Sequence, residues 1–479
     1  MKKVKPEALR ILLIVLAVTL VSLSVVFVPS ITGDEASYQK INEAVNAAIS
    51  KQHNLLFGSL YIGSQEYVTD TTIGSGPGTD SDSNTGSSPG SNPDSNSLST
   101  PELTPEPKPE DIVIDIAEKL PELKDSLDAM AKRYSCIAVS LAYFDGDAGE
   151  YYLYQYGYAN TRTEQKVNAD TTFRIASLSK LMTVICAMTL VDAGLLDLDE
   201  DISVYLGYQV KNPNYTNTPI TSRMLMQHTS SIHDSDVFQT SLFAAVPKPL
   251  RQLVESRSSF QNRRPGSQFE YSNFGISVLA AICEHASGEM LDSLARRAVF
   301  DKLEIDAAFV PKNLKDTSNI AVIYNHTHRQ IRNVESQLEV VDSDGILGHD
   351  HNIAQGGLTI SMLDFAKILA MLGNDGEIYN DRILSADAVH AINDANVNGP
   401  GYKQGLATRL VPGFTLGEDE GFYYHTGSAW GVFAQYLYTA DDTNRGIIVL
   451  TTGASTGRLS NGMHRIGTDF SRLVWEELN

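Results

Sequence analysis

One serine of this chain has a lysine three residues later, a spacing that can support nucleophilic catalysis. Residues 177–180 read Ser-Leu-Ser-Lys and lie where a loop enters an apolar helix expected over 177–193. Residues three apart share a helix face, so the Lys180 amine can approach the Ser177 hydroxyl. A serine hydroxyl needs a base, and a lysine can serve where burial or a nearby cation favours its neutral form. The N–H groups at a helix N-terminus could also stabilise an oxyanion.

A Ser-x-x-Lys spacing alone is weak evidence, because an ordinary polar helix start contains it too. The same spacing occurs at residues 37–40, which read Ser-Tyr-Gln-Lys. Only the context within a folded domain therefore favours Ser177 as a nucleophile.

A second motif, Tyr-Ser-Asn at residues 271–273, offers a phenol and a carboxamide in front of a predicted helix. Tyr271 could act as a base when nearby cations stabilise its anion, and its phenol could later protonate a leaving group. Asn273 could hydrogen-bond both Lys180 and a substrate carbonyl. The structural alternative is a packed tyrosine in a helix-entry loop. A similar triplet at residues 215–217 lies in turn-like sequence.

A third motif, His-Thr-Gly-Ser at residues 425–428, lies on a predicted strand. Gly427 would let a substrate backbone approach closely. The N–H of Ser428 could complete an oxyanion hole with that of Ser177, and His425 or Thr426 could bind a substrate carboxylate. A surface strand with a satisfied histidine is the alternative.

The elements that must position these motifs lie within residues 111–479. Strand patterns occur at 136–144 and 151–158, and again near the end at 423–426, 432–439 and 446–452. Helices are expected over 112–134 with an interruption near Pro121, and over 275–285, 364–372 and 463–478. The pattern predicts an α/β (α+β) domain. Its antiparallel sheet is built from both ends of the domain, flanked by helices, with a large helical insertion.

The N-terminal 110 residues divide into three segments. Residues 1–33 carry four basic residues ahead of an apolar run of about 18 residues, roughly enough to span a bilayer. An uncleaved signal-anchor is favoured over a cleaved signal peptide, and both predict export of the rest of the chain. Residues 34–68 form a juxtamembrane segment of unknown role. Residues 69–110 form a disordered Ser/Gly/Asp/Pro linker. We therefore expect a single-pass protein of the cell membrane with an extracellular domain, or a secreted one after cleavage.

The composition limits the classes of ligand and partner that the chain is expected to bind. The formal net charge of −21 argues against nucleic acid, which requires a basic face. The three cysteines lie in apolar stretches and are expected to be buried free thiols. Two His-x-His pairs, at 326–328 and 349–351, could bind zinc but lie in loop-like sequence, so we predict no metal and no cofactor.

Taken in order, the three motifs resemble the serine β-lactamase and penicillin-binding-protein superfamily, in the branch with class C β-lactamases, D,D-carboxypeptidases, D-aminopeptidases and esterases. The resemblance extends over about residues 136–452. Its recurring blocks are Thr172–Lys180, Ile220–Ile232, Pro265–Gly275 and Ala354–Thr359.

The resemblance implies a role for each motif residue. Ser177 would be the acylated nucleophile, Lys180 and Tyr271 the base pair, and Asn273 a substrate-orienting group. His425, Thr426 and Gly427 would bind substrate, and Ser428 would supply the second oxyanion N–H. Two departures matter. The Ser-Asp-Asn of class A enzymes is absent, and His425 replaces the lysine of most lactamases. A neutral histidine holds a carboxylate less firmly, which favours esterase-like or aminopeptidase-like members.

The sequence therefore predicts an extracytoplasmic serine hydrolase that works through a Ser177 acyl-enzyme. Its substrate would be a small peptide, ester or lactam, with cell-wall-related peptides or esters favoured. A true β-lactamase and a non-catalytic penicillin-binding or sensor domain are the alternatives. The oligomeric state is left open.

Overall fold

The computed structural model describes residues 111–479, apart from 243, 245–246, 341–344 and 350–352. The predicted anchor, juxtamembrane segment and linker, residues 1–110, lie outside these described residues. Within the described part, no helix is both long enough and apolar enough to cross a membrane.

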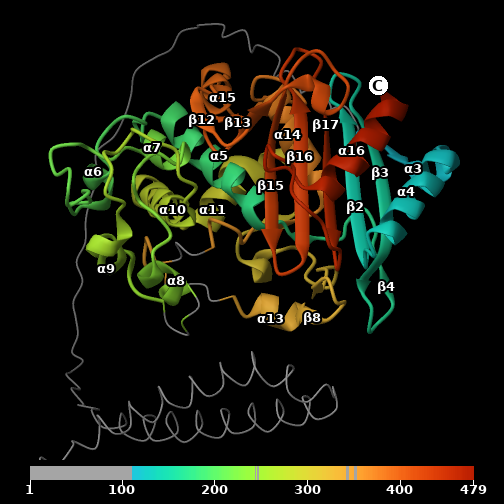
Figure 1. The fold of residues 1–479 in the computed structure, drawn as a ribbon, viewed down its shortest axis with the longest axis horizontal. Coiled ribbons are helices and arrows are strands. Elements are labelled where there is room, and N and C mark those ends of the chain that lie inside the picture. Colours follow the sequence, from blue (N-terminus) through green and yellow to red (C-terminus); the bar gives the residue numbers. More distant parts are fainter. Residues whose placement is uncertain (1–110, 243, 245–246, 341–344, 350–352) are drawn as a thin grey trace, which may run out of the picture. The chain divides into compact units, whose positions relative to one another are not determined.

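A large sheet assembled from both ends of the domain forms the centre of the fold (Figure 1). Its strand order is β1-β3-β2-β17-β16-β15-β14-β13-β12, and β4 pairs with β3. The junction between the two ends is the antiparallel pair of β2 and β17, in which Tyr143 faces Ile447. The predicted sheet is therefore present. Its strands are β1 (Ile112–Asp115), β2 (Ala138–Asp145), β3 (Glu150–Asn160), β4 (Gln165–Lys166), β12 (Val397–Gly399), β13 (Tyr402–Gln404), β14 (Arg409–Val411), β15 (Phe422–Ala429), β16 (Val432–Thr439) and β17 (Arg445–Thr452).

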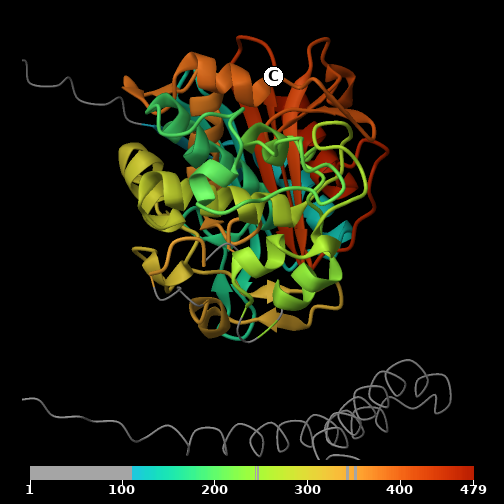
Figure 2. The same cartoon turned by 90° about the vertical axis from the view of Figure 1, so that its left-hand side faces the viewer.

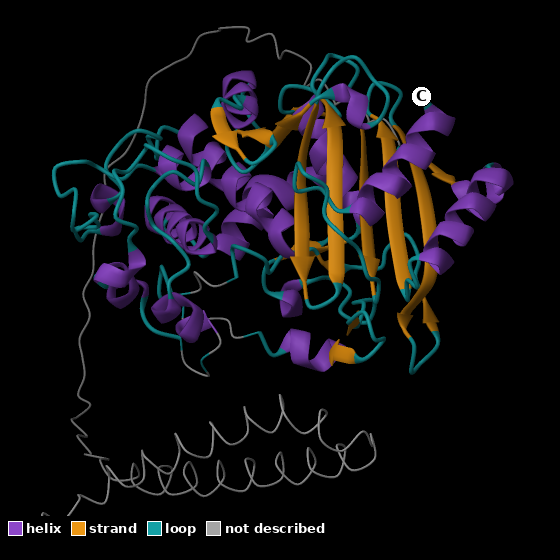
Figure 3. Cartoon of the chain, in the orientation of Figure 1, coloured by secondary structure: helices purple, strands orange, loops and turns teal. Residues whose placement is uncertain are grey.

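Helices cover both faces of this sheet (Figure 3). Strand side chains alternate between two apolar cores, so Val139, Leu141 and Tyr143 join one cluster while Ala142 and Phe144 join the other. The first face packs against α3 (Ile116–Lys119), α4 (Pro121–Arg133) and the C-terminal α16 (Arg465–Leu478). The second packs against α14 (Met362–Gly373), which joins the larger core that also contains the helical insertion.

The insertion between β3 and β15 carries most of the remaining helices, which lie in front of the sheet in Figure 2. Its two longest helices are α5 (Ser179–Asp192) and α10 (Asn273–Ser287), both almost entirely buried. The others are short: α6 (Ser203–Leu206), α7 (Ser222–Met226), α8 (Asp236–Leu242), α9 (Leu250–Val254), α11 (Leu291–Ala295), α12 (Asp301–Leu303), α13 (Val334–Leu338) and α15 (Ala386–Asn393). Three small sheets lie outside the main sheet. They are β5 (Phe173–Arg174) with β9 (Thr359–Ile360) and β6 (Ala307–Ala308), β7 (Ile323–Tyr324) with β8 (Gln330–Arg332), and β10 (Glu377–Ile378) with β11 (Asp381–Arg382).

The start of the domain differs from the prediction. Residues 112–115 form a strand rather than the first turn of a helix, because their Ile-Val-Ile-Asp sequence is β-branched and pairs in parallel with β3. Pro121 then begins α4 instead of interrupting a single helix, as proline fits the first helical turn. At the start of α14, the Ser361 side chain caps the helix by accepting a hydrogen bond from the Asp364 N–H.

Candidate active site

Ser177 lies in a single 3₁₀ turn, η1 (Ala176–Leu178), which joins β5 to α5. Ala176 has a φ of 51°, a left-handed conformation that non-glycine residues rarely adopt. Strain of this kind persists only where neighbouring structure enforces it. Here the segment 354–358 does so, because Leu358 accepts a hydrogen bond from the Ile175 N–H and donates one to Ser179 Oγ. The family block around Gly356 is thus the support of the nucleophile turn.

Lys180 reaches Ser177 as the sequence spacing requires. Its Nζ lies 3.0 Å from Ser177 Oγ and 2.6 Å from the carbonyl oxygen of Gln355. The residue is fully buried, and no carboxylate of the described residues lies within ion-pair distance of it. The amine is therefore within hydrogen-bond reach of the Ser177 hydroxyl, the contact that proton transfer between the two groups would need.

Tyr271 lies between two cations. The Lys180 Nζ is 5.0 Å from the centroid of its ring, and the guanidinium carbon of Arg409 is 5.7 Å away. Both cations are therefore within cation–π distance of the Tyr271 ring. The ring also lies against His228, with centroids 4.6 Å apart. The three functional groups predicted from two separate motifs therefore converge on one point, although their catalytic roles stay predictions.

His228 fixes the loop that carries Tyr271. Its Nδ1 accepts a hydrogen bond from the Ser272 N–H at 3.3 Å, and its carbonyl accepts one from the Glu270 N–H. Burial lowers the pKa of His228 well below its usual value, and the charges of Lys180 and Arg409 lower it further. The imidazole is thus neutral and acts as an acceptor. The sequence placed His228 within the family block Ile220–Ile232 but did not indicate that it holds the loop carrying Tyr271.

Asn273 begins α10, and its amide is committed to a residue that sequence reasoning missed. Asn273 Nδ2 donates to Asp234 Oδ2 at 2.6 Å, and the N–H of Phe274 donates to Asp234 Oδ1 at 2.8 Å. A carboxylate at a helix N-terminus is favourably placed. The hydrogen bond expected between Asn273 and Lys180 is not among those of the described residues. Asp234 lies 39 residues before Asn273 in an irregular loop, so no local signal identified it.

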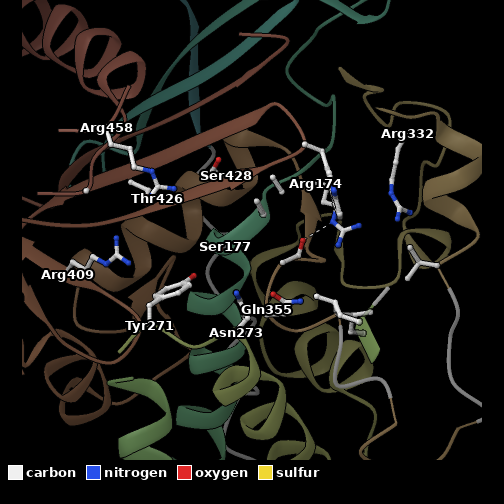
Figure 4. Close-up of a pocket in the computed structure, with 18 of the residues that line it drawn as sticks. Arg174, Ser177, Tyr271, Asn273, Arg332, Gln355, Arg409, Thr426, Ser428 and Arg458 are labelled. Atoms are coloured by element: carbon white, nitrogen blue, oxygen red, sulfur yellow. Dashed lines mark hydrogen bonds between the residues drawn. The ribbon is translucent and has the colours of Figure 1, made fainter. Parts of the chain in front are cut away.

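The His-Thr-Gly-Ser motif lies on β15, opposite the nucleophile turn. β14 pairs with β15 only as far as Arg409 opposite Tyr424, so residues 425–429 leave one strand edge free of any described strand. Thr426 and Ser428 line the cavity beside Ser177 (Figure 4). This open edge can pair with an extended substrate, and it presents backbone N–H groups to a reacting carbonyl.

Gly427 allows a close approach of backbone within the protein itself. A Cβ atom at this position would lie 2.5 Å from the carbonyl oxygen of Ile175 and 3.3 Å from the Ser177 nitrogen. The glycine therefore admits the turn that carries Ser177, and its contact with a substrate backbone stays a prediction. The sequence indicated a close backbone approach correctly but could not identify which backbone approaches.

His425 is buried, and neither ring nitrogen has a hydrogen-bond partner among the described residues. Burial lowers its pKa well below the usual value, followed by the positive charges of Arg409 and Lys180. The side chain is therefore neutral, as the sequence comparison with lysine-containing relatives suggested. A cation is nevertheless present in this region, because Arg409 supplies it from the neighbouring strand.

Four arginines surround the cavity of about 770 Å³ that contains Ser177. Figure 4 shows Arg409 and Arg458 on one side of Ser177 and Arg174 and Arg332 on the other. None forms a salt bridge with an acidic side chain of the described residues. The whole chain has a formal net charge of −21, whereas the lining of this cavity carries these four positive charges. This local positive charge indicates an anionic ligand. The sequence signal for Arg409 was a charged residue in the strand-like segment Thr-Arg-Leu-Val.

His326, His328 and His349 are not among the described residues that line this cavity. His328 Nε2 lies 2.8 Å from the carbonyl oxygen of Ser135, and His351 is outside the described residues. Among the residues that the structure describes, no three His, Cys, Asp or Glu side chains gather as metal ligands. All three cysteines are free and buried, as predicted.

The comparisons with known proteins agree with this geometry. The Beta-lactamase family model matches residues 123–466. The D-alanyl-D-alanine-carboxypeptidase/endopeptidase AmpH of Escherichia coli strain K12 is 28% identical over 182 residues, which cover 37% of this chain and 47% of AmpH. The lovastatin esterase of Penicillium rubens is 27% identical over 307 residues, covering 56% of this chain and 76% of the esterase. The chain thus aligns with about half the length of AmpH.

Solved structures share the fold. A β-lactamase/D-alanine carboxypeptidase from Pseudomonas syringae superposes with a TM-score of 0.59 at 18% identity, covering 75% of this chain and 99% of that one. The hydrolase EstCE1 gives a TM-score of 0.59 at 19% identity with the same coverage. The family model matches most of the chain, and Ser177 is in contact with Lys180. This protein therefore belongs to the beta-lactamase family and is a serine hydrolase.

Proposed function

We propose that the protein is a carboxypeptidase-type hydrolase that cleaves small peptides ending in a free carboxylate, through an acyl-enzyme on Ser177. The observation that carries this proposal is Arg409, which lines the cavity beside Tyr271 and has no acidic partner among the described residues. Arginine binds carboxylates through two parallel hydrogen bonds, so it offers an anchor for a C-terminal residue.

The structure around Arg409 makes it a rigid anchor. Its side chain is only 6% exposed, and its guanidinium carbon lies 4.5 Å from the ring centroid of Tyr402 and 5.8 Å from that of Tyr424. Cation–π contacts on several rings limit the rotamers of the side chain. Its Nε is buried and has no hydrogen-bond partner among the described residues.

In the acylation step, the Ser177 oxygen attacks the scissile carbonyl carbon and passes its proton to the Lys180–Tyr271 pair. The carbonyl oxygen becomes an oxyanion held by the N–H groups of Ser177 and Ser428. Collapse breaks the carbon–nitrogen bond, and the departing amine takes a proton from Tyr271. The leaving group must therefore lie on the Tyr271 side of Ser177, where Arg409 can hold its carboxylate.

In the second step, water attacks the acyl carbon and transfers its proton to the same Lys180–Tyr271 pair. The oxyanion forms again at the same two N–H groups, and the bond to the Ser177 oxygen breaks. The Lys180–Tyr271 pair therefore acts as the base in both half-reactions. Between these two steps, it acts as the acid that protonates the departing amine.

The test compares two substrates that differ only at the C-terminus, N-acetyl-D-Ala-D-Ala and its C-terminal amide. We expect the wild-type kcat/KM to favour the acid by about 10-fold to 100-fold, the value of a charged hydrogen-bonded pair. Arg409→Lys should lose most of this preference, because an ammonium cannot bind bidentately. The proposal fails if neither peptide is hydrolysed, or if the amide is cleaved as well as the acid.

An esterase is the second candidate, and a specific observation favours it. His425 is neutral and buried, so it adds no charge to carboxylate binding. The longer of the two sequence alignments quoted above is with an esterase. Hydrolysis of a short p-nitrophenyl ester at a kcat/KM above that of either peptide would select this alternative. Hydrolysis of a chromogenic cephalosporin would instead select a β-lactamase. Stable labelling by a fluorescent penicillin without turnover of any substrate would indicate a penicillin-binding or sensor domain.

We also propose that the domain acts outside the cytoplasm, tethered by the N-terminal segment. The support is the basic and apolar sequence of residues 1–33 and the Ser/Gly/Asp/Pro composition of residues 69–110. Protease treatment of intact cells should degrade the domain while leaving a cytoplasmic marker protein intact. Protection of the domain would contradict an external location.

A further inference from the structure

A second cationic group lies on the opposite side of Ser177 from Arg409. Trp430, at the tip of the β15–β16 hairpin, is 38% exposed and lines the cavity. The guanidinium carbon of Arg174 lies 4.8 Å from its ring centroid, and that of Arg332 lies 5.1 Å away. Figure 4 shows the side chains of Arg174 and Arg332 on the same side of the cavity.

These two arginines have few protein partners. Arg174 Nε donates to the carbonyl oxygen of Gly356, and Arg332 Nη1 makes one long contact with the carbonyl oxygen of Ser336 at 3.5 Å. Neither has an acidic side chain within ion-pair distance among the described residues. Glu339, an exposed residue at the rim of the cavity, forms no salt bridge with either arginine. Most of their N–H donors are therefore available to a ligand.

Two like charges held this close repel each other. Burial and, to a smaller extent, the charge of Arg332 together lower the pKa of Arg174 to about 10. The indole ring offsets part of this cost through cation–π attraction, but it cannot neutralise either charge. An anion bound between the two guanidinium groups would do so.

The position of this group identifies the part of a substrate that it would contact. Trp430 follows Ser428 by two residues, directly after the end of β15 at Ala429. The edge of β15 runs from the Arg409 end, past Ser177, to Trp430. Since the leaving group lies at the Tyr271 and Arg409 end, the acyl part of an extended substrate lies against Trp430.

We propose that Arg174, Arg332 and Trp430 form an acyl-side subsite that binds a side-chain carboxylate on the residue preceding the scissile pair. The substrate would then carry two carboxylates, one at each end of the β15 edge. This inference adds the substrate class to the proposed carboxypeptidase function and rests on it for the direction of binding.

Binding can be measured without turnover in a Ser177→Ala background. Isothermal titration calorimetry would compare N-acetyl-Glu-D-Ala-D-Ala with its isosteric N-acetyl-Gln-D-Ala-D-Ala. We expect the glutamyl peptide to bind about 10-fold to 100-fold more tightly, as a charged hydrogen-bonded pair implies. Adding Arg332→Gln should reduce this difference to about 2-fold or less, because the affinity for the glutamyl peptide falls much more than the affinity for the glutaminyl peptide.

Removal of any positive charge weakens anion binding slightly through the long-range field, so a matched control is needed. Arg329→Gln removes the same charge from the same β7–β8 hairpin at an exposed position that does not line the cavity. It should preserve the preference for the glutamyl peptide. Arg332 is preferred to Arg174 as the test position, because Arg174 also supports the segment 354–358 and its loss could disturb folding.

The outcomes separate the subsite from the activity. Equal affinity for the two peptides, or a preference that survives Arg332→Gln, would overturn the subsite whether or not the wild type hydrolyses either peptide. A preference that requires Arg332, without hydrolysis of either peptide by the wild type, would retain the subsite and overturn the carboxypeptidase function instead. When both hold, kcat/KM in the wild type should show the same preference as the affinities.

Discussion

Gly427 lies so close to the nucleophile turn that a Cβ atom at its position would be 2.5 Å from the carbonyl oxygen of Ile175. This contact fixes the separation between β15 and η1. It therefore fixes where the N–H groups of Ser428 and Ser177 stand relative to each other. The shape of the proposed oxyanion hole therefore depends on the absence of a side chain at Gly427.

Replacement of Gly427 by alanine should push β15 away from Ser177. A misplacement of about 1 Å in an active site costs roughly 100-fold in rate, so we expect kcat/KM to fall by about that factor. The thermal midpoint should fall as well, because both contacting atoms belong to the backbone. Gly457→Ala is the control, since a Cβ there meets nothing within 4 Å. Similar activity of the two variants would show that the spacing is not critical.

Replacement of Lys180 by arginine should abolish acylation even though a positive charge remains. A guanidinium stays protonated in proteins and cannot accept the Ser177 proton. The larger group also does not fit a site where Nζ is already 2.6 Å from Gln355 O. Loss of a general base costs about 100-fold to 10,000-fold, which we expect in the rate of labelling by a fluorophosphonate.

The same exchange at exposed Lys166 should leave the labelling rate unchanged. Ser177→Ala should give no labelling at all, whereas Ser37→Ala should label like the wild type. Labelling of Ser177→Ala would show that another residue is the nucleophile.

Asp234 should be important for both stability and activity. Its carboxylate accepts hydrogen bonds from Asn273 Nδ2 and the Phe274 N–H, and it receives a third from Ser272 Oγ at 3.3 Å. Asp234→Ala should lower the free energy of unfolding by about 1.5–3 kcal/mol, the value of hydrogen bonds to a charged group. It should also lower kcat/KM, because the Tyr-Ser-Asn segment loses its support.

Denaturant titrations and peptide hydrolysis would measure the two effects of Asp234→Ala. Asp236→Ala provides a nearby comparison, since that exposed carboxylate accepts no side-chain hydrogen bond in the described structure. If the two variants are equally stable and active, the carboxylate of Asp234 is not a support of the site.

Stability should fall as the pH drops below about 6.5. Burial holds the pKa values of His228 and His425 well below normal and lowers that of His464 to about 3. The unfolded chain binds protons at these histidines below pH 6.5 while the folded chain does not, so protonation favours unfolding. Each such histidine contributes a slope of up to about 1.4 kcal/mol per pH unit.

Asp364 acts in the opposite direction. Burial raises the pKa of this carboxyl to about 6, so between pH 4 and 6 the folded chain binds a proton that the unfolded chain does not. Denaturant titrations from pH 5 to 8 would measure the net slope. His464→Gln should reduce it, whereas His390→Gln, at an exposed position, should not. A stability that is independent of pH in this range would contradict the burial of neutral histidines.

The sequence determined those parts of the protein that depend on local pattern. Alternating and β-branched residues identified the strands of both ends, and the register of 177–180 placed Lys180 one turn from Ser177, which the 3.0 Å contact confirms. The prediction of a helix at residues 112–115 was wrong. These residues pair with β3 as a strand, although a helix follows them directly. A strand edge is a tertiary property and has no local signature.

The tertiary structure alone decided which groups surround the nucleophile. Arg409 and Arg332 lie in separate strands, and packing of distant elements brings both to one cavity. Asp234 comes from a third segment and holds Asn273, which lines the same cavity. The sequence showed a histidine at position 425, where most lactamases have a lysine, and so predicted weaker carboxylate binding. In the structure, Arg409 on the adjacent strand β14 supplies a positive charge near His425. Spacing along the chain fixes contacts within one turn or one strand, whereas charge around a site depends on how distant elements pack.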